Sequence, residues 1–417
     1  MPLLSYIDQP TTWDALSRCV IVRGWCFGAD GEAITGVRLR FADRDLHGVV
    51  GLPRPDVKAA LPNAPGDDTG FEVRGTLPAG RHELSIDARL RDGTWTPFFT
   101  RIVTIPRLWL PLWAGGGEWT ELMFFQMPAH MAYPPRAIAP EKFPAPRARA
   151  QWPKFSIVTP SYQQAQFLPA TIRSVLDDQP GVRCDYVVFD GGSRDGSAEL
   201  IAAEAPRLLA WTSEPDGGQA DAIAKGFAHT SGEPEDVMGW INSDDFYLPG
   251  ALAFVADYFA RHPEVDVVYG NRVIVDEESR EVGRWFLPPH DAEVLRLNDF
   301  VPQETVFWRR RVWDRVGGLD TKFKFALDWD LLLRFQAAGA CIVRLPYFLA
   351  CFRVHAAQKT SAVMHSTGQQ EITLLRERTY GRTFPPHEIE GHPRLMSYLR
   401  KSAFREACWR RLGLRLP

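Results

Sequence analysis

The stretch Met238-Gly-Trp-Ile-Asn-Ser-Asp-Asp-Phe-Tyr-Leu-Pro-Gly-Ala-Leu252 decides the fold of this chain. Its apolar start, residues 237–241, predicts a buried strand, and the apolar positions of residues 252–259 recur at the spacing of a helix. Two adjacent carboxylates, Asp244 and Asp245, lie between these segments. Open α/β sheets bind ligands at the carboxyl ends of their strands, so the pair is placed for binding.

Adjacent carboxylates suit Mg²⁺ or Mn²⁺, ions that usually accompany a phosphate-bearing substrate. The alternative is that one Asp caps the following helix. Pro249 at the first helical position would put that cap near Leu248, three residues beyond Asp245, so capping explains the pair poorly. An Asp pair in a plain turn is the other alternative.

The bulk composition is that of an ordinary globular chain. Its 417 residues allow two or three domains, and a net charge of −3 gives no reason to expect nucleic acid as a partner. The six cysteines include no C-x-x-C pair and indicate reduced residues of a cytoplasmic protein. The N-terminus does not have the pattern of a signal peptide.

Residues 1–105 contain short alternating runs separated by turn residues, which predicts a small all-β sandwich domain. Trp25, Trp95 and Phe98 are consistent with a sugar-binding platform, although aromatic residues at inward positions are more often core. Residues 106–153 hold nine prolines among many aromatic residues and predict an arm packed on a domain, with residues 134–153 as the tether.

Residues 154–365 alternate strand and helix patterns, which predicts a mostly parallel sheet flanked by helices. Residues 366–417 are predicted to form a helical basic tail. Within it, residues 394–415 carry seven Lys/Arg against one Glu, interleaved with apolar side chains. That pattern favours either a helix at a membrane surface or a basic helix packed on its own protein.

Polar clusters follow four of the predicted strands of this sheet. They are Thr159-Pro-Ser-Tyr162, Asp190-Gly-Gly-Ser-Arg-Asp-Gly196, Ser213-Glu-Pro-Asp-Gly-Gly-Gln219 and Asn242-Ser-Asp-Asp245. Each alone could be turn chemistry, but four at one sheet edge predict a single crevice. Asp190 could accept hydrogen bonds from a nucleobase. Because the chain has no Walker-type or G-x-G-x-x-G loop, a metal on Asp245 would supply positive charge for a diphosphate.

A further candidate element is Ala326-Leu-Asp-Trp-Asp-Leu331. Asp330 is placed to pair with Arg334 one helical turn later, which leaves Asp328 to face the crevice as a general base. The alternative is that Asp328 is a helix N-cap. His355 is a candidate third metal ligand or a structural histidine.

Six of these motifs resemble the family 2 glycosyltransferases of the GT-A fold, in the family's order, over about residues 155–360. They are Phe155-Ser-Ile-Val-Thr-Pro-Ser-Tyr162, Val188-Phe-Asp-Gly-Gly-Ser-Arg-Asp-Gly-Ser197, Ser213-Glu-Pro-Asp-Gly-Gly-Gln-Ala-Asp-Ala-Ile223, Trp240-Ile-Asn-Ser-Asp-Asp245, Ala326-Leu-Asp-Trp-Asp-Leu331 and Phe352-Arg-Val-His355. The resemblance implies inverting transfer from a nucleotide-diphosphate sugar with Mn²⁺ or Mg²⁺.

By motif position, the resemblance implies a donor-nucleotide pocket, a metal site and a catalytic base. The donor pocket comprises Thr159, Pro160, Tyr162, Asp190, Asp216, Gly218, Gln219 and Asp244. The metal ligands are Asp245 and His355, and the base is Asp328. Gly191, Ala224 and Leu327 depart from residues frequent in the family, which leaves nucleotide selectivity open.

The expected reaction is a single displacement in which Asp328 deprotonates an acceptor hydroxyl. Gln303, Glu304 and Trp329 are the expected acceptor contacts. The resemblance and the basic tail favour a glycan or lipid-linked acceptor in surface polysaccharide synthesis, at the inner membrane face. The alternatives are a sugar-nucleotide pyrophosphorylase, a two-carboxylate hydrolase and a non-catalytic carbohydrate-binding protein.

Overall fold

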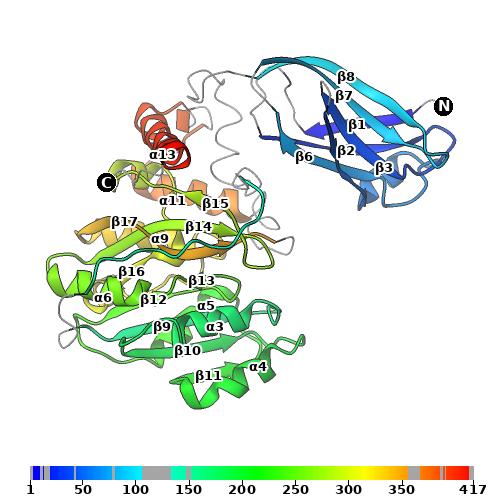
Figure 1. Cartoon of the computed structure of the whole chain (residues 1–417). Coiled ribbons are helices and arrows are strands. Elements are labelled where there is room, and N and C mark those ends of the chain that lie inside the picture. Colours follow the sequence, from blue (N-terminus) through cyan, green and yellow to red (C-terminus); the bar gives the residue numbers. More distant parts are fainter. Residues whose placement is uncertain are drawn as a thin grey trace. The chain divides into compact units, whose positions relative to one another are not determined.

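The computed structural model describes residues 3–9, 13, 19–41, 44–77, 80–105, 133–146, 152–355, 367–385, 388–389 and 391–412. The chain divides into two compact units, Met1–Ala114 and Gly115–Pro417 (Figure 1). The aromatic residues predicted for the arm over residues 106–132 lie outside the described ranges.

The first unit is built from two small antiparallel sheets. One sheet has the order β1-β2-β6-β5 and the other β4-β3-β7-β8. The strands are β1 Leu3–Gln9, β2 Cys19–Gly28, β3 Gly36–Phe41, β4 Arg44–His47, β5 Val49–Leu52, β6 Gly70–Thr76, β7 Gly80–Arg89 and β8 Trp95–Ile105, and helix α1 spans Pro55–Ala60. Buried side chains from both sheets form one cluster, so the sheets pack face to face as a sandwich.

The aromatic residues considered for a sugar platform are engaged within this unit. The Arg38 guanidinium lies 4.4 Å from the centroid of the Trp95 ring. Phe98 packs edge-on against Phe71, with ring centroids 5.6 Å apart. Trp25 stacks on the fully buried Phe27, also with centroids 5.6 Å apart. These contacts match the core alternative.

The second unit contains a mixed sheet with the order β11-β10-β9-β12-β16-β14-β17-β13, with β15 paired to β14. Its strands in the described ranges are β9 Phe155–Ser161, β10 Cys184–Asp190, β11 Ala210–Ser213, β12 Val237–Trp240, β13 Phe246–Tyr247, β14 Val267–Val275, β15 Glu281–Trp285, β16 Phe307–Arg309 and β17 Ile342–Arg353. Strands β11, β10, β9 and β12 are parallel neighbours, and β16 runs antiparallel between β12 and β14.

Helices cover both faces of this sheet. The α-helices are α3 Leu168–Leu176, α4 Ser197–Glu204, α5 Gln219–Ala228, α6 Ala251–Arg261, α7 Ala292–Leu297, α8 Arg310–Val316, α9 Leu327–Ala337, α11 Gln369–Tyr380 and α13 Pro393–Leu412, with short 3-10 helices at Ala205–Arg207 and Gln303–Thr305. Because side chains alternate along a strand, Val158 of β9 joins the cluster under α5 and α9 whereas Ile157 joins the one under α3 and α6. The predicted fold class, a mostly parallel α/β sheet after a small all-β part, is confirmed.

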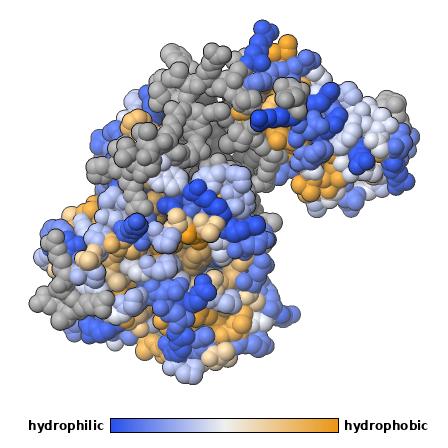
Figure 2. Space-filling model, in the orientation of Figure 1, coloured by the Kyte–Doolittle hydropathy of each residue, from blue (hydrophilic) through white to orange (hydrophobic). Residues whose placement is uncertain are grey.

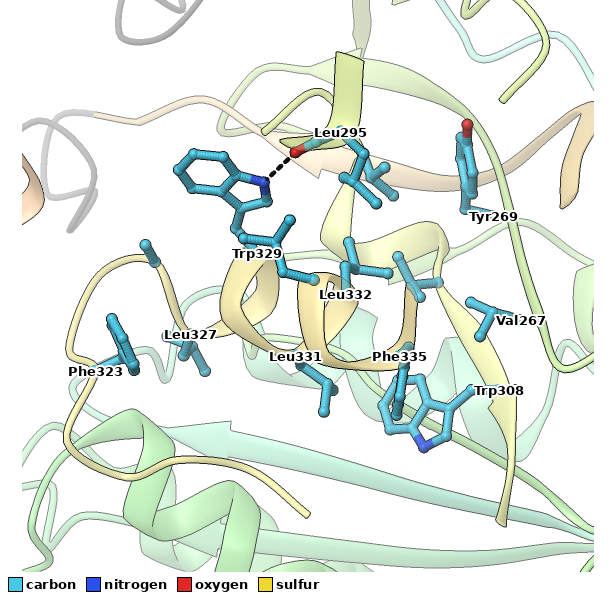
Figure 3. Packing of buried hydrophobic residues seen from close by; sticks show 14 of the residues in the cluster. Val267, Tyr269, Leu295, Trp308, Phe323, Leu327, Trp329, Leu331, Leu332 and Phe335 are labelled. Carbon is cyan, nitrogen blue, oxygen red and sulfur yellow. Dashed lines mark hydrogen bonds between the residues drawn. The ribbon is translucent and has the colours of Figure 1, made fainter. Parts of the chain in front are cut away.

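Helix α9 lies at the centre of one core (Figure 3). Leu331 and Phe335 point from it toward Trp308 of β16, and Trp329 donates from Nε1 to the Leu295 carbonyl of α7. Trp308 and Trp329 are fully buried. This packing fixes the helix whose first turn carries Asp328.

The stretch predicted as a tether packs against the second unit where it is described. Arg136 exchanges backbone hydrogen bonds with Glu281 of β15, and its guanidinium donates to the Glu281 carboxylate at 2.7 Å. Phe143 stacks on Phe254 of α6, with ring centroids 5.0 Å apart. Residues 133–146 therefore differ from a solvated tether, because a buried carboxylate and an aromatic contact fix them.

The basic tail helix α13 also packs on the second unit. Leu395 and Tyr398 are buried in the α9 core, and Ser402 donates to the Phe286 carbonyl at 2.6 Å. Phe404 is left 52% exposed. Across the described residues, no helix combines the length and apolarity needed to cross a bilayer. The surface in Figure 2 mixes hydrophilic and hydrophobic residues.

The close packing of α5 on β9 gives a test of the fold. A Cβ added at Gly226 would lie 2.5 Å from Cγ1 of Val158. Gly226→Ala should therefore destabilise the protein by about 1–3 kcal/mol in urea unfolding, whereas the same change in an open helix gains about 1 kcal/mol. Adding Val158→Ala should restore part of the loss, and an unchanged or raised stability of Gly226→Ala alone would contradict this packing.

Candidate active site

Four strand-end loops meet at one edge of the sheet. In the parallel register Asp190 lies opposite Ser161 on one side and Ser213 on the other. Ile241, just after β12, donates its N–H to the Val158 carbonyl of β9 at 3.0 Å. The loops after β9, β10, β11 and β12 therefore lie side by side, as parallel neighbouring strands require.

The outer part of this edge is open and centred on Gly191. A Cβ at Gly191 would lie 3.2 Å from Cδ2 of Tyr162 and 3.3 Å from Oδ2 of Asp216. Tyr162 is 62% exposed, and the Asp216 carboxylate accepts from the N–H of Gly218 at 2.7 Å. An exposed aromatic ring beside a carboxylate provides a stacking surface and a hydrogen-bond acceptor for a nucleoside.

The polar groups in the inner part of this edge make their hydrogen bonds within the protein. Asp190 is 1% exposed. Its carboxylate accepts from the N–H and hydroxyl of Ser193 at 2.8 and 2.6 Å and from the Ser213 hydroxyl at 2.7 Å. Thr159 is buried and shares a hydrogen bond with Tyr186, while Pro160 is buried beside it. These groups join the loops, and Tyr162 and Asp216 form the accessible surface.

Three side-chain amides form a chain across the site. Gln219, the first residue of α5, donates to Asn242 at 2.7 Å. Asn242 donates to Gln303 at 3.2 Å, and Gln303 donates to the Trp240 carbonyl at 2.9 Å. The structure thus brings the predicted residues Gln219 and Gln303 together through Asn242.

Asp244 and His355 form a pair beside a cavity. Nε2 of His355 lies 3.0 Å from Oδ2 of Asp244. The cavity has a volume of about 400 Å³ and is lined by Gln163–Phe167, Asp195, Glu277 and His355. A carboxylate and an imidazole suit Mn²⁺, and ions of this kind commonly complete their shell with substrate phosphates and water. No group of three or more potential ligands occurs within the described ranges, so the pair fits an ion shared with a phosphate ligand.

Asp245 turns into the protein, unlike its neighbour. It is 1% exposed, and its Oδ1 accepts from the N–H of Arg353 at 3.0 Å. Burial raises its pKa well above the usual range, and the charges of Asp244 and Glu304 act in the same direction. This burial does not favour the prediction that Asp245 is the metal ligand, because its carboxylate faces Arg353, whereas the Asp244 carboxylate meets His355, which lines the cavity.

Arg353 joins the loop that carries Asp244 to a neighbouring turn. Its Nε donates to the Asp244 carbonyl at 2.8 Å, and Nη1 donates to the carbonyls of Asp276 and Glu277 at 3.0 Å each. The residue is 1% exposed. His355, two residues along, is thereby fixed relative to Asp244.

A buried ion pair lies under the site. Arg272 of β14 donates from Nε and Nη2 to the two carboxylate oxygens of Glu304, at 2.7 and 2.6 Å. Burial raises the pKa of Asp245, Asp299 and Asp328, and the charge of Arg272 opposes that rise in each of them. The prediction of Glu304 as an acceptor contact does not fit, since its carboxylate is 1% exposed and fully paired.

Asp328 lies in the first turn of α9 and is half-buried. Its Oδ1 accepts from the N–H of Trp329 at 3.0 Å. Burial raises its pKa to about 6, a value suited to a general base near neutral pH. As predicted, Asp330 pairs with Arg334, at 2.8 Å.

Trp329 is not available to an acceptor. Its side chain is fully buried, and its indole N–H is bonded to the Leu295 carbonyl at 2.7 Å (Figure 3). This burial does not support the prediction that Trp329 contacts the acceptor, since one step along a helix turns a side chain about 100° away from its neighbour.

Two charged residues of this site escaped sequence reasoning. Asp299, half-buried after α7, has its pKa raised by burial and by the charge of Asp328. Arg272 stands in a fully buried strand, and a charged residue inside an apolar run was a usable signal for it. Asp299 follows no strand and had no such signal.

Comparison with known proteins identifies the family of the domain that carries these strand-end loops. Residues 156–316 match the family model "Glycosyl transferase family 2". An uncharacterized glycosyltransferase of Mycobacterium tuberculosis is 29% identical over 204 residues, 48% of this chain and 73% of that relative. A PGL/p-HBAD biosynthesis glycosyltransferase of Mycobacterium bovis is 27% identical over 195 residues, 46% of this chain and 73% of that relative.

Solved structures give a weaker likeness. The mannosyltransferase PcManGT from Pyrobaculum calidifontis, in complex with GDP-Man and Mn²⁺, aligns with a TM-score of 0.43 at 17% identity, covering 68% of this chain and 81% of its own. The family match and the strand-end motifs agree on residues 156–316. The chain contains a glycosyltransferase family 2 domain over residues 156–316, preceded by additional N-terminal β-sheets.

Proposed function

We propose that this enzyme is a metal-dependent inverting glycosyltransferase that moves a sugar from a nucleotide-diphosphate donor to a hydroxyl of a glycan or lipid-linked acceptor. The observation that carries the proposal is the hydrogen bond from Nζ of Lys324, four residues before Asp328, to the Gly217 carbonyl at 2.7 Å. It joins the segment before α9 to the strand-end loop that carries Asp216, which supports a base and a donor sharing one site.

The donor nucleoside would lie on the exposed part of the strand-end edge. Tyr162 offers a ring for stacking, and Asp216 offers an acceptor for N–H or ribose hydroxyl groups. The amides of Gln219 and Asn242 lie between this edge and the Asp244–His355 pair. Asp190 and Thr159 shape the pocket from inside.

The divalent ion, Mn²⁺ or Mg²⁺, would be held by Asp244 and His355. When bound, it would neutralise the charge of the diphosphate leaving group. Arg353 keeps the two ligands together, and buried Asp245 supports the turn from below. This assignment replaces the earlier one to Asp245.

Asp328 is the proposed general base. It takes the proton from an acceptor hydroxyl as that oxygen attacks the anomeric carbon, opposite the leaving nucleoside diphosphate, so the configuration inverts. Gln303 remains a candidate acceptor contact because it is half-buried at the site and bonded to Asn242. The assignment of the Mycobacterium bovis relative to PGL/p-HBAD biosynthesis supports a surface-glycan or lipid-linked acceptor.

Membrane contact, if the acceptor is lipid-linked, would fall to the outer face of α13. Arg400, Lys401 and Phe404 are exposed there. Two cations beside an aromatic ring suit an anionic lipid surface at the cytoplasmic side.

The base assignment predicts a selective loss. Asp328→Asn should reduce transfer by about 10²–10⁴-fold, because the amide cannot take the proton, while the donor dissociation constant changes by about twofold or less. Donor turnover and calorimetric binding measure the two effects. Asp314→Asn, an exposed carboxylate on α8, is the control. Equal loss of binding and turnover would contradict a base role.

A second prediction concerns pH. Because the pKa of Asp328 is raised to about 6, the base is protonated below that pH. At saturating donor and Mn²⁺, kcat should fall about tenfold per pH unit below about pH 6 and level off above it. Burial is the largest cause of this raised pKa, the charge of Glu304 acts in the same direction, and the charge of Arg272 opposes it. A kcat that stays constant down to pH 5 would contradict the assignment.

A third prediction concerns the metal. Asp244→Ala and His355→Ala should each weaken nucleoside-diphosphate binding by about 10–100-fold in Mn²⁺ and have little effect in EDTA. Calorimetry with UDP and GDP makes the measurement. Glu277→Gln lines the same cavity outside the pair and serves as the control. Full Mn²⁺ dependence in Asp244→Ala would rule out the site.

A further inference from the structure

Three consecutive backbone N–H groups converge on the carboxylate of Glu371. Lys324 donates to Oε1 at 2.7 Å, while Phe325 and Ala326 donate to Oε2 at 2.8 and 2.9 Å. Successive N–H groups aimed at one point form an anion-binding concavity. Glu371 belongs to α11, so the carboxylate comes from a segment more than forty residues along the chain.

The start of α9 needs such a partner. The helix begins at Leu327, and the preceding Ala326 offers no side-chain oxygen for the free N–H groups. Asp328 accepts instead from its own neighbour, Trp329. Glu371 therefore fixes the backbone two residues before Asp328.

Helix α11 also fixes α9 and its surroundings at two further points. Arg378 donates to the fully buried carboxylate of Asp330 at 2.5 Å. Arg376 donates to the Leu297 carbonyl at 2.9 Å, two residues before Asp299. Helix α11 thus contacts α9 on both sides of Asp328, at the backbone of Ala326 before it and at the side chain of Asp330 after it.

The same segment contacts the donor side of the site. Nζ of Lys324 donates to the Gly217 carbonyl at 2.7 Å, in the loop that carries Asp216. Lys324 therefore contacts Glu371 through its backbone and the donor loop through its side chain.

We propose that Glu371 is a positioning residue for transfer: through the N–H groups of residues 324–326 it sets where the Asp328 carboxylate lies relative to the donor. The inference rests on the proposed role of Asp328 as the base. Helix α11 lies beyond the segment that matches the family model, and the charge of Glu371 acts through the backbone and not on substrate.

The test is a comparison of Glu371→Gln with Glu377→Gln in the full chain. The amide keeps one oxygen, which can accept from two of the three N–H groups, and turns its N–H₂ group toward the third. The segment must therefore shift, and displacements of about 1 Å can cost about 100-fold in rate. Glu371→Gln should lower kcat by about 10–100-fold with donor KM unchanged. Glu377, on the same helix, makes no side-chain hydrogen bond to a described residue, and its variant should keep the wild-type kcat.

Two more variants separate positioning from general stability. Glu371→Asp keeps the charge but shortens the side chain by one methylene. This variant should fold, and its kcat should decrease by less than that of Glu371→Gln. Lys324→Met removes the bond to Gly217 and keeps the backbone N–H, so it should raise donor KM more than it lowers kcat. If Glu371 only stabilised the fold, its variants would lower the melting temperature. Their kcat, measured well below that temperature, would then equal the wild-type value.

The outcomes distinguish this inference from the base assignment. Wild-type kcat in Glu371→Gln and Glu371→Asp, alongside an inactive Asp328→Asn, overturns the positioning role alone. Full activity of Asp328→Asn overturns the proposed base instead. A loss of kcat in both Glu371 variants, with Glu377→Gln unaffected, supports the inference.

Discussion

The site depends on the buried ion pair between Arg272 and Glu304. Removing two charges from water is costly, and the cost is offset here by two parallel charge-assisted hydrogen bonds. The Arg272 guanidinium also lies 4.3 Å from the ring centroid of Phe352, which fixes its plane. Since Glu304 already uses this cation, it only partly compensates Asp245, Asp299 and Asp328. Burial therefore disfavours the charged forms of these carboxyls, and a bound cation would favour them.

Asp190 and Asp328, two carboxylates near this edge, differ in the number of hydrogen bonds that they accept. Asp190 accepts three hydrogen bonds from Ser193 and Ser213, so its oxygens are occupied in joining neighbouring loops. Asp328 accepts one hydrogen bond among the described residues, and burial raises its pKa to about 6. A buried carboxylate with few donors has a raised pKa, as Asp328 does. This supports the proposal that Asp328 is the base, whereas Asp190 joins neighbouring loops.

Local pattern was enough to predict the sheet and its strand-end loops. Strands such as β9 and β12 are short apolar runs that end in polar turns. The residues of the strand and of its own turn are therefore enough to predict its position. The sequence pattern did not predict which way individual side chains point, or which residues far apart in the sequence pair with each other. Adjacent residues in a turn or a helix face different ways, which misassigned Asp245 and Trp329. Glu304 is paired with Arg272, thirty-two residues earlier, and no spacing rule predicts such a partner. Strand β13, two residues long, is too short for any periodicity.

The match to the family model ends at residue 316, whereas Asp328, His355 and Glu371 all lie beyond it. The matched segment contains the strand-end edge proposed for the donor. The following segment supplies the proposed base, one proposed metal ligand and helix α11, which contacts α9. These two parts share one sheet through the pairing of β17 with β13 and β14. At the site they also meet where Lys324 reaches Gly217 and where Arg353 and His355 contact Asp244. In the proposed mechanism, donor recognition and proton transfer therefore fall to separate stretches of chain that one sheet holds together.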